Sequence, residues 1–149
     1  MTNTHDGETR TPEQIAELFA IAGREIEAIE VVAVADVNES ELERVAGEYA
    51  IPNTYTDFRD LLARDDIQAV DVCMHNNLHA PATIAGLESG KHVFCEKPPG
   101  RDVGDIVRVI ECEKKPPGLK LKYGFNHRYH DSVRDALEIL HSGELGEVI

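Results

Sequence analysis

The sequence contains no tryptophan, only three cysteines and few basic residues, and no apolar run in it is long enough to cross a membrane. The sequence has 15 lysines and arginines and 28 acidic residues, which gives a formal net charge of −13. Such a surface repels the phosphates of nucleic acids and anionic lipids, so we expect no nucleic-acid partner and no membrane partner. The first residues, MTNTHDGETR, lack signal-peptide character, and an odd number of cysteines argues against a disulfide framework. We therefore predict a cytoplasmic protein with reduced thiols.

Predicted strands and helices alternate along the 149 residues, a length typical of one domain. Apolar runs predict strands at 30–37, 53–56, 68–74, 92–95 and 119–125; helical spacing predicts helices at 12–29, 39–50, 57–64, 79–90, 103–110 and 131–142. This alternation is typical of an α/β fold with a doubly wound parallel sheet, as in Rossmann-like domains. The outward-facing Lys120 and Lys122 indicate that the last strand is half-exposed or lies at an edge. We expect the last helix to bury Val133, Leu137 and Leu140.

Polar residues gather directly after the predicted strands. Asp36 follows one strand, His75-Asn76-Asn77 another, Glu96-Lys97 a third and Asn126-His127-Arg128 the last. Open parallel sheets bind ligands at the carboxyl ends of their strands. The coincidence predicts a binding site at this edge.

Several of these residues have a second interpretation. Asp36 either caps the following helix or accepts hydrogen bonds from both ribose hydroxyls of an adenosine. Arg128 is either a solvated charge or a ligand for a phosphate or carboxylate. His75 and His79 have the i, i+4 spacing of a zinc helix, but the acidic base of that motif is missing, so we predict no metal site. Asn76 and His79 are better interpreted as polar groups around a cofactor.

The stretch HVFCEKPPG, residues 92–100, carries the candidate catalytic residue. A short apolar strand runs directly into Glu96, Lys97 and two prolines. A surface lysine in a turn accounts for neither the prolines nor the buried strand before it. A lysine held at the end of a buried strand is therefore a candidate for a functional role.

From Val31 to Ile149 the chain resembles the first half of a Gfo/Idh/MocA oxidoreductase. The matching stretches are VVAVADVN, YTDFRDLLARDDIQAVDVC, NNLHAPATIAGLESGKHVFCEKP, KYGFNHRY and SGELGEV. The resemblance implies a Rossmann domain that binds NAD(P), followed by an α+β domain that binds a sugar, a cyclitol or a sugar nucleotide. It implies that Lys97 lies between nicotinamide and substrate, that Glu96 lies by the nicotinamide ribose, and that the peptide before Pro98 is cis. Asp36 would favour NAD over NADP.

The resemblance thus gives one predicted site. Lys97 is the catalytic residue, and the cofactor contacts are Asp36, Asn76, His79, Glu96, Lys97, Asn126 and Arg128.

The chain also departs from the family pattern. The stretch HDGETRTPEQIAELF has Gly7 as its only glycine, so the phosphate-binding glycine loop and the first strand are missing where they are expected. We therefore expect residues 1–145 to form an incomplete Rossmann domain, with 146–149 as a stub of the substrate domain. The strands at 30–37 and 68–74 would then flank an empty position in the sheet.

Two functions stay open at this point. The first is an NAD-dependent dehydrogenase that acts on a sugar-like alcohol, with the complete protein a candidate homo-oligomer. The second is a non-catalytic remnant that serves as a nucleotide-binding or dimerisation module. The missing glycine loop favours the second for this polypeptide alone, whereas the first remains the better description of its ancestry.

Overall fold

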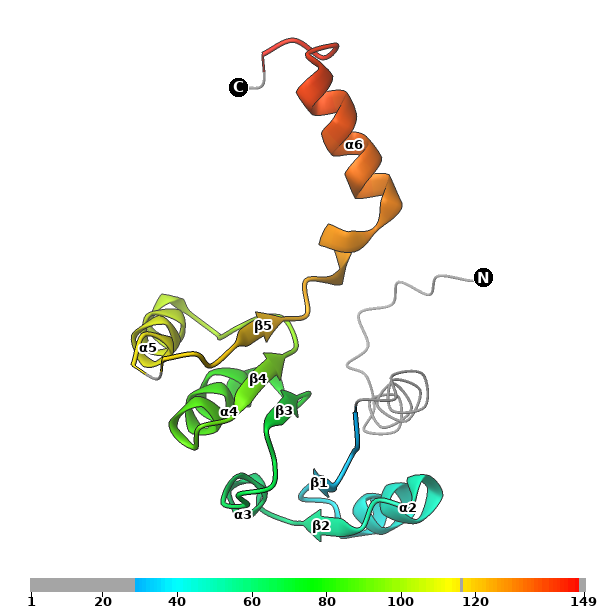
Figure 1. The fold of residues 1–149 in the computed structure, drawn as a ribbon, viewed down its shortest axis with the longest axis vertical. Helices are drawn as coiled ribbons and strands as arrows, with labels where there is room; N and C mark the ends of the chain where they lie inside the picture. Colours follow the sequence, from blue (N-terminus) through cyan, green and yellow to red (C-terminus); the bar gives the residue numbers. More distant parts are fainter. Residues whose placement is uncertain (1–28, 116, 148–149) are drawn as a thin grey trace.

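The computed structural model describes residues 29–115 and 117–147, and strands and helices alternate along them (Figure 1). The elements are β1 (Ala33–Ala35), α2 (Glu39–Tyr49), β2 (Asn53–Tyr55), α3 (Phe58–Leu62), β3 (Ala69–Val72), α4 (Asn76–Glu88), β4 (His92–Cys95), α5 (Val103–Glu113), β5 (Leu121–Tyr123), the 3-10 helix η1 (Asn126–Tyr129) and α6 (Asp131–Ser142). The helix predicted over 12–29 lies outside these residues, apart from Ile29. None of the helices in the described ranges has the length and apolar content needed to cross a bilayer.

The strands form two parallel sheets. One pairs β1 with β2, and the other has the order β3-β4-β5. β1 and β3 do not pair, and within residues 29–115 and 117–147 no strand lies between them. The prediction that these two strands flank an open position also concerns residues 1–28, which lie outside the described residues, so it stays a prediction. Strand β5 stands at the end of its sheet and is partly exposed, which agrees with the predicted half-exposed or edge position.

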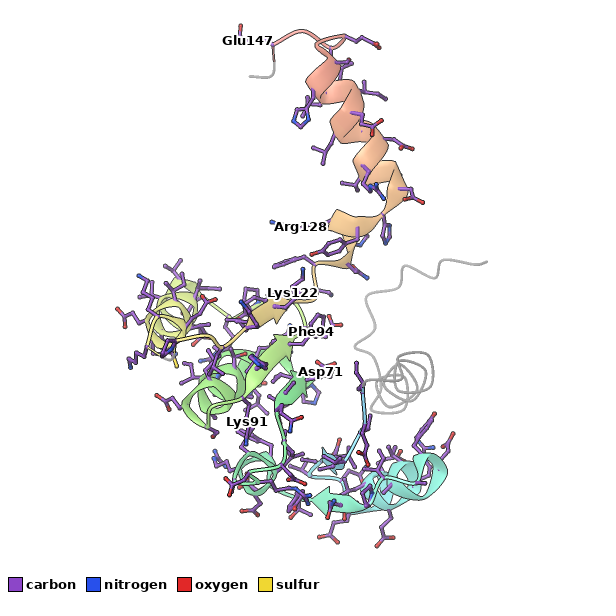
Figure 2. The ribbon with its side chains drawn as sticks, viewed as in Figure 1. Asp71, Lys91, Phe94, Lys122, Arg128 and Glu147 are labelled. Carbon is purple, nitrogen blue, oxygen red and sulfur yellow. The ribbon has the colours of Figure 1, made fainter. Side chains whose placement is uncertain are left out.

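Helices α4 and α5 pack together on one face of the three-stranded sheet. Buried residues of α4, α5, β3 and β4 form a hydrophobic cluster between the helices and the sheet, namely Val72, Ala82, Leu87, Val93, Cys95 and Cys112. Because side chains alternate along a strand, the residues between these point to the other face. Asp71, Phe94 and Lys122 are direct neighbours on that face, one from each strand (Figure 2). Phe94 is 39% exposed there.

Close approach of α4 to the sheet depends on a glycine. A Cβ on Gly86 would lie 2.8 Å from Cγ2 of Val93 and 3.2 Å from Cγ2 of Val70. Real Cβ atoms essentially never come as close as the first of these distances. Glycine at this position therefore sets how deeply α4 lies on β3 and β4.

Side chains at the helix starts explain several element boundaries. Asn38, Asp57 and Asp102 are the N-caps of α2, α3 and α5, and each accepts a hydrogen bond from a backbone N–H of the first turn. Helix α6 ends at Gly143, whose φ of 82° suits glycine. These local signals can be read in the sequence, and the predicted bounds of α6 are confirmed.

Helix α6 projects away from the two sheets (Figure 1). The prediction that it buries Val133, Leu137 and Leu140 is wrong for the described residues. None of its side chains is buried, and Leu137 is 45% exposed. The apolar spacing is real, but α6 packs against η1 rather than against the sheet, so that spacing produces no burial.

Candidate functional site

The residues singled out in the sequence follow the carboxyl ends of the strands. Asp36 directly follows β1, Asn76 begins α4 after β3, Glu96 and Lys97 follow β4, and Asn126 begins η1 after β5. All strand pairs are parallel, so within each sheet these ends meet at one edge. Asn76, Glu96, Lys97 and Asn126 therefore follow the same end of the three-stranded sheet, whereas Asp36 follows a strand of the other sheet.

Asp36 is held at the end of β1. Its backbone N–H donates to the Tyr55 carbonyl of β2 over 3.1 Å, and its Oδ1 accepts from the Asn38 N–H at 2.7 Å. Asn38 caps α2, so the capping role considered for Asp36 belongs to the residue two positions later. The second carboxylate oxygen, Oδ2, accepts no hydrogen bond from the residues that the structure describes.

The Glu96-Lys97 segment is attached to both neighbouring strands. The Glu96 N–H donates to the Val72 carbonyl of β3 at 3.0 Å, and the Gly124 N–H donates to the Cys95 carbonyl at 2.9 Å. Lys97 is exposed, and the Lys97–Pro98 peptide is cis, as the family resemblance implied. The strand end is thus hydrogen-bonded up to Glu96, and the side chain of Lys97 just beyond it is exposed to solvent.

Gly124 is a site residue that the sequence reasoning missed. A Cβ at this position would lie 2.9 Å from Oε2 of Glu96, so a larger residue would push the carboxylate away. The available signal was a glycine directly after the strand that neighbours Glu96. Glycine at a strand end often marks such a close approach.

The far end of the Lys97 segment is anchored by Asp105, which is 1% exposed. Its Oδ2 accepts from the Arg101 backbone N–H at 2.9 Å and from Arg101 Nε at 3.1 Å, and Oδ1 accepts from Arg108. The hydrogen bonds from Arg101 hold the pKa of the Asp105 carboxyl below its usual range. Sequence reasoning gave this aspartate no role.

Asn126 and Arg128 lie in η1, beyond the end of β5. The Arg128 guanidinium is 5.8 Å from the centre of the Phe125 ring, and Lys122 lies 4.6 Å from the centre of the Tyr129 ring and donates to its hydroxyl. Figure 2 shows Arg128 above the strand that carries Lys122. Arg128 and Lys122 both line an open pocket of about 280 Å³, whose lining residues are Leu121, Lys122, Tyr123, Phe125, Arg128 and Tyr129.

His79 and Asn76 are placed differently although both belong to the start of α4. Asn76 is exposed in the first turn. His79 is 1% exposed, with Nδ1 2.6 Å from the Pro98 carbonyl oxygen and Nε2 2.8 Å from the Met74 carbonyl oxygen. Both ring nitrogens thus face backbone within the protein. The cofactor contact predicted for His79 stays a prediction.

Most of the chain matches a known family. Residues 10–124 match the model of an oxidoreductase family with an NAD-binding Rossmann fold. Inositol 2-dehydrogenase of Salmonella paratyphi B is 35% identical over 123 residues, which make up 82% of this chain and 37% of that protein. Inositol 2-dehydrogenase of Gluconacetobacter diazotrophicus is 37% identical over 120 residues, which are 80% of this chain and 36% of that protein.

Solved structures agree with this match. Scyllo-inositol dehydrogenase from Lactobacillus casei with bound cofactor NAD(H) and scyllo-inositol superimposes with a TM-score of 0.81 at 27% identity. The match covers 93% of this chain and 40% of that one. The chain spans about 37% of the length of the first curated relatives it matches. By sequence and by fold, the chain belongs to the Gfo/Idh/MocA family of oxidoreductases, and it matches the NAD-binding Rossmann domain of that family.

Proposed function

We propose that the protein is an NAD-dependent dehydrogenase that oxidises a secondary alcohol of a cyclitol or a related sugar. The observation that carries this proposal is the position of Lys97. It is an exposed lysine two residues after β4, and the residue before it, Glu96, donates its backbone N–H to Val72 of β3. This is the end of the sheet where parallel sheets bind ligands. The names of the matched relatives, which are inositol dehydrogenases, support the substrate class.

The residues at the strand ends suit an NAD cofactor. Asp36 presents an oxygen that accepts no hydrogen bond within the described residues, and two ribose hydroxyls are donors of the kind it would take. The same negative charge would repel a 2′-phosphate, which supports NAD over NADP. We place Asn76, Glu96, Asn126 and Arg128 around the same cofactor, with Glu96 on the nicotinamide side because it neighbours Lys97.

The chemistry divides between cofactor and protein. When bound, NAD supplies the acceptor for the hydride that leaves the alcohol carbon. Lys97 contacts the hydroxyl oxygen, orients it and assists the departure of its proton toward solvent, while the C–O bond becomes a carbonyl. Loss of one hydride and one proton balances the oxidation of the alcohol to a ketone.

The test is replacement of Lys97 by alanine. We expect turnover of myo-inositol with NAD to fall by about a hundredfold or more, the usual scale of general acid–base assistance, while NAD affinity changes little. Lys114→Ala is the matched control. Lys114 is an exposed lysine just after α5, which runs from the carboxyl end of β4 back toward the start of β5. A Lys97→Ala protein with near-normal turnover would remove Lys97 from the mechanism.

Within residues 29–115 and 117–147, β1 and β3 belong to separate sheets, and this favours a second candidate, a nucleotide-binding module without turnover of its own. The same experiment separates the two, because NAD binding without oxidation of any cyclitol supports the module. Absence of both NAD binding and turnover would overturn both candidates.

We further propose a cytoplasmic location, which the free thiols of Cys73, Cys95 and Cys112 support.

We also propose that residues 1–145 form the cofactor domain. Limited proteolysis that cut first within β4 or α5 rather than near residue 145 would contradict this domain assignment.

A further inference from the structure

His79 is a buried polar residue whose contacts are with backbone. It lies in the first turns of α4, is 1% exposed, and faces two carbonyl oxygens that are far apart in sequence. Nε2 lies 2.8 Å from the oxygen of Met74, just after β3, and Nδ1 lies 2.6 Å from the oxygen of Pro98. The ring therefore bridges the end of one strand to the segment that follows another.

The short contact to Pro98 indicates which group donates. A carbonyl oxygen can only accept, so the hydrogen bond to Pro98 that we assign requires the tautomer with a hydrogen on Nδ1. Removing this bond would leave a carbonyl oxygen without its partner, which is costly where water is excluded.

The segment from Lys97 to Gly100 has few other attachments. Pro98 and Pro99 have no backbone N–H to donate, and the Lys97 N–H donates to Oε2 of its neighbour Glu96 at 3.3 Å. Beyond the segment, the Arg101 N–H is held by Asp105. Among the residues that the structure describes, one hydrogen bond links residues 97–100 to a more distant element. It joins the His79 ring of α4 to the Pro98 carbonyl oxygen.

We propose that His79 is a positioning residue, which fixes the backbone at Pro98 and thereby the location of the neighbouring Lys97 side chain. Its effect on the segment follows from the contacts alone. Its effect on turnover rests on the proposed function, because that is where Lys97 acts on a substrate.

Two substitutions separate the two contacts of the ring. In asparagine the amide nitrogen is bonded to Cγ, as Nδ1 is in histidine, so His79→Asn keeps a donor near Pro98. In glutamine the amide nitrogen is one bond further out, like Nε2, so His79→Gln keeps a donor near Met74. Both variants lose the ring and one contact, which makes each the control for the other.

The readout is the backbone order parameter of Lys97 and Gly100, measured by NMR relaxation on the 149-residue chain. In the wild type and in His79→Asn we expect order parameters of about 0.85, as in rigid backbone. In His79→Gln we expect order parameters below about 0.6, as in flexible backbone. Val93, whose N–H donates to Lys120 across β4 and β5, is the internal reference and should stay rigid in all three proteins. Equal values in His79→Gln and wild type, or equal loosening in both variants, would overturn the proposal.

Two further measurements complete the test. If neither variant folds, nitrogen-15 spectra of the wild-type ring decide, because a His79 Nδ1 without a hydrogen contradicts the proposed bond. In steady-state kinetics, His79→Gln should lower kcat more than His79→Asn does, because only the asparagine keeps a donor near Pro98. A wild-type chain without turnover refutes the proposed function but leaves the relaxation test of His79 intact.

Discussion

The substitution Gly86→Ala tests how tightly α4 packs on the sheet. The alanine Cβ would lie 2.8 Å from Cγ2 of Val93 and 3.2 Å from Cγ2 of Val70. Valine has little freedom at χ1, and Val93 is buried, so its methyl group has little room to move away from an added Cβ. Overpacking of this kind costs about 1–3 kcal/mol, whereas alanine in place of glycine inside a helix gains about 0.8–1.0 kcal/mol. We therefore expect Gly86→Ala to lower the free energy of unfolding by up to about 2 kcal/mol.

Gly47→Ala is the matched control. Gly47 lies within α2, and a Cβ there would meet no atom within 4 Å. Only the helix-propensity gain remains, so we expect stabilisation of about 0.8–1.0 kcal/mol. The difference between the two variants cancels the propensity and isolates the steric cost.

The assay is urea unfolding followed by circular dichroism, with linear extrapolation to water. A Gly86→Ala, Val93→Ala double variant adds a check, because the two changes should couple by about 0.5 kcal/mol or more if the methyl groups collide. Gly86→Ala that stabilises the protein as much as Gly47→Ala would show that the helix is not held at the distance the structure gives.

Three further predictions concern charge and thiols. Asp36→Ser should bring the affinities for NAD and NADP closer together in titrations, and a wild-type protein that binds NADP as tightly as NAD would refute the role of Asp36. The fold lowers the pKa of the Asp105 carboxyl. The ionised carboxylate therefore stabilises the folded protein at pH values above the unfolded pKa of about 4, and this stabilisation is lost as the pH falls below that pKa. In urea titrations the stability gap between wild type and Asp105→Asn should therefore narrow from about pH 4 downward, and a constant gap would contradict this. Burial raises the pKa of Cys95 to about 11 and raises that of Cys73 as well. Alkylation at neutral pH should therefore be much slower in the native than in the unfolded protein, and equal rates would exclude the described burial.

Local patterns in the sequence were enough to predict most elements. The bounds of β4 and α6 agree with the predictions because each ends at an unambiguous signal, an abrupt change to charge and proline for β4 and a glycine for α6. The places of Asp36 after β1 and of Lys97 after β4, each beyond the carboxyl end of a parallel strand, could be predicted from the alternation of strands and helices.

Contacts between distant parts of the chain could not be predicted in this way. His79 is buried because the carbonyl of Pro98, 19 residues later, accepts from its ring, and no spacing rule contains that information. Asp36 and Asn38 are both suitable caps for α2, and the geometry of the turn, not the residue type, selects Asn38. The sequence likewise shows that α6 has an apolar side but not whether another element covers it.

The projecting position of α6 has a consequence for how the protein melts. Helices shorter than about 12–15 residues are marginal in water unless tertiary packing supports them, and α6 has 12 residues that pack mainly against η1. Its helix–coil equilibrium is therefore separate from the cooperative unfolding of the sheets, and it relaxes within about 0.1–1 μs. On heating, the helical signal of α6 should decline gradually below the main transition, so a sloping native baseline belongs to this helix and not to a loosening core.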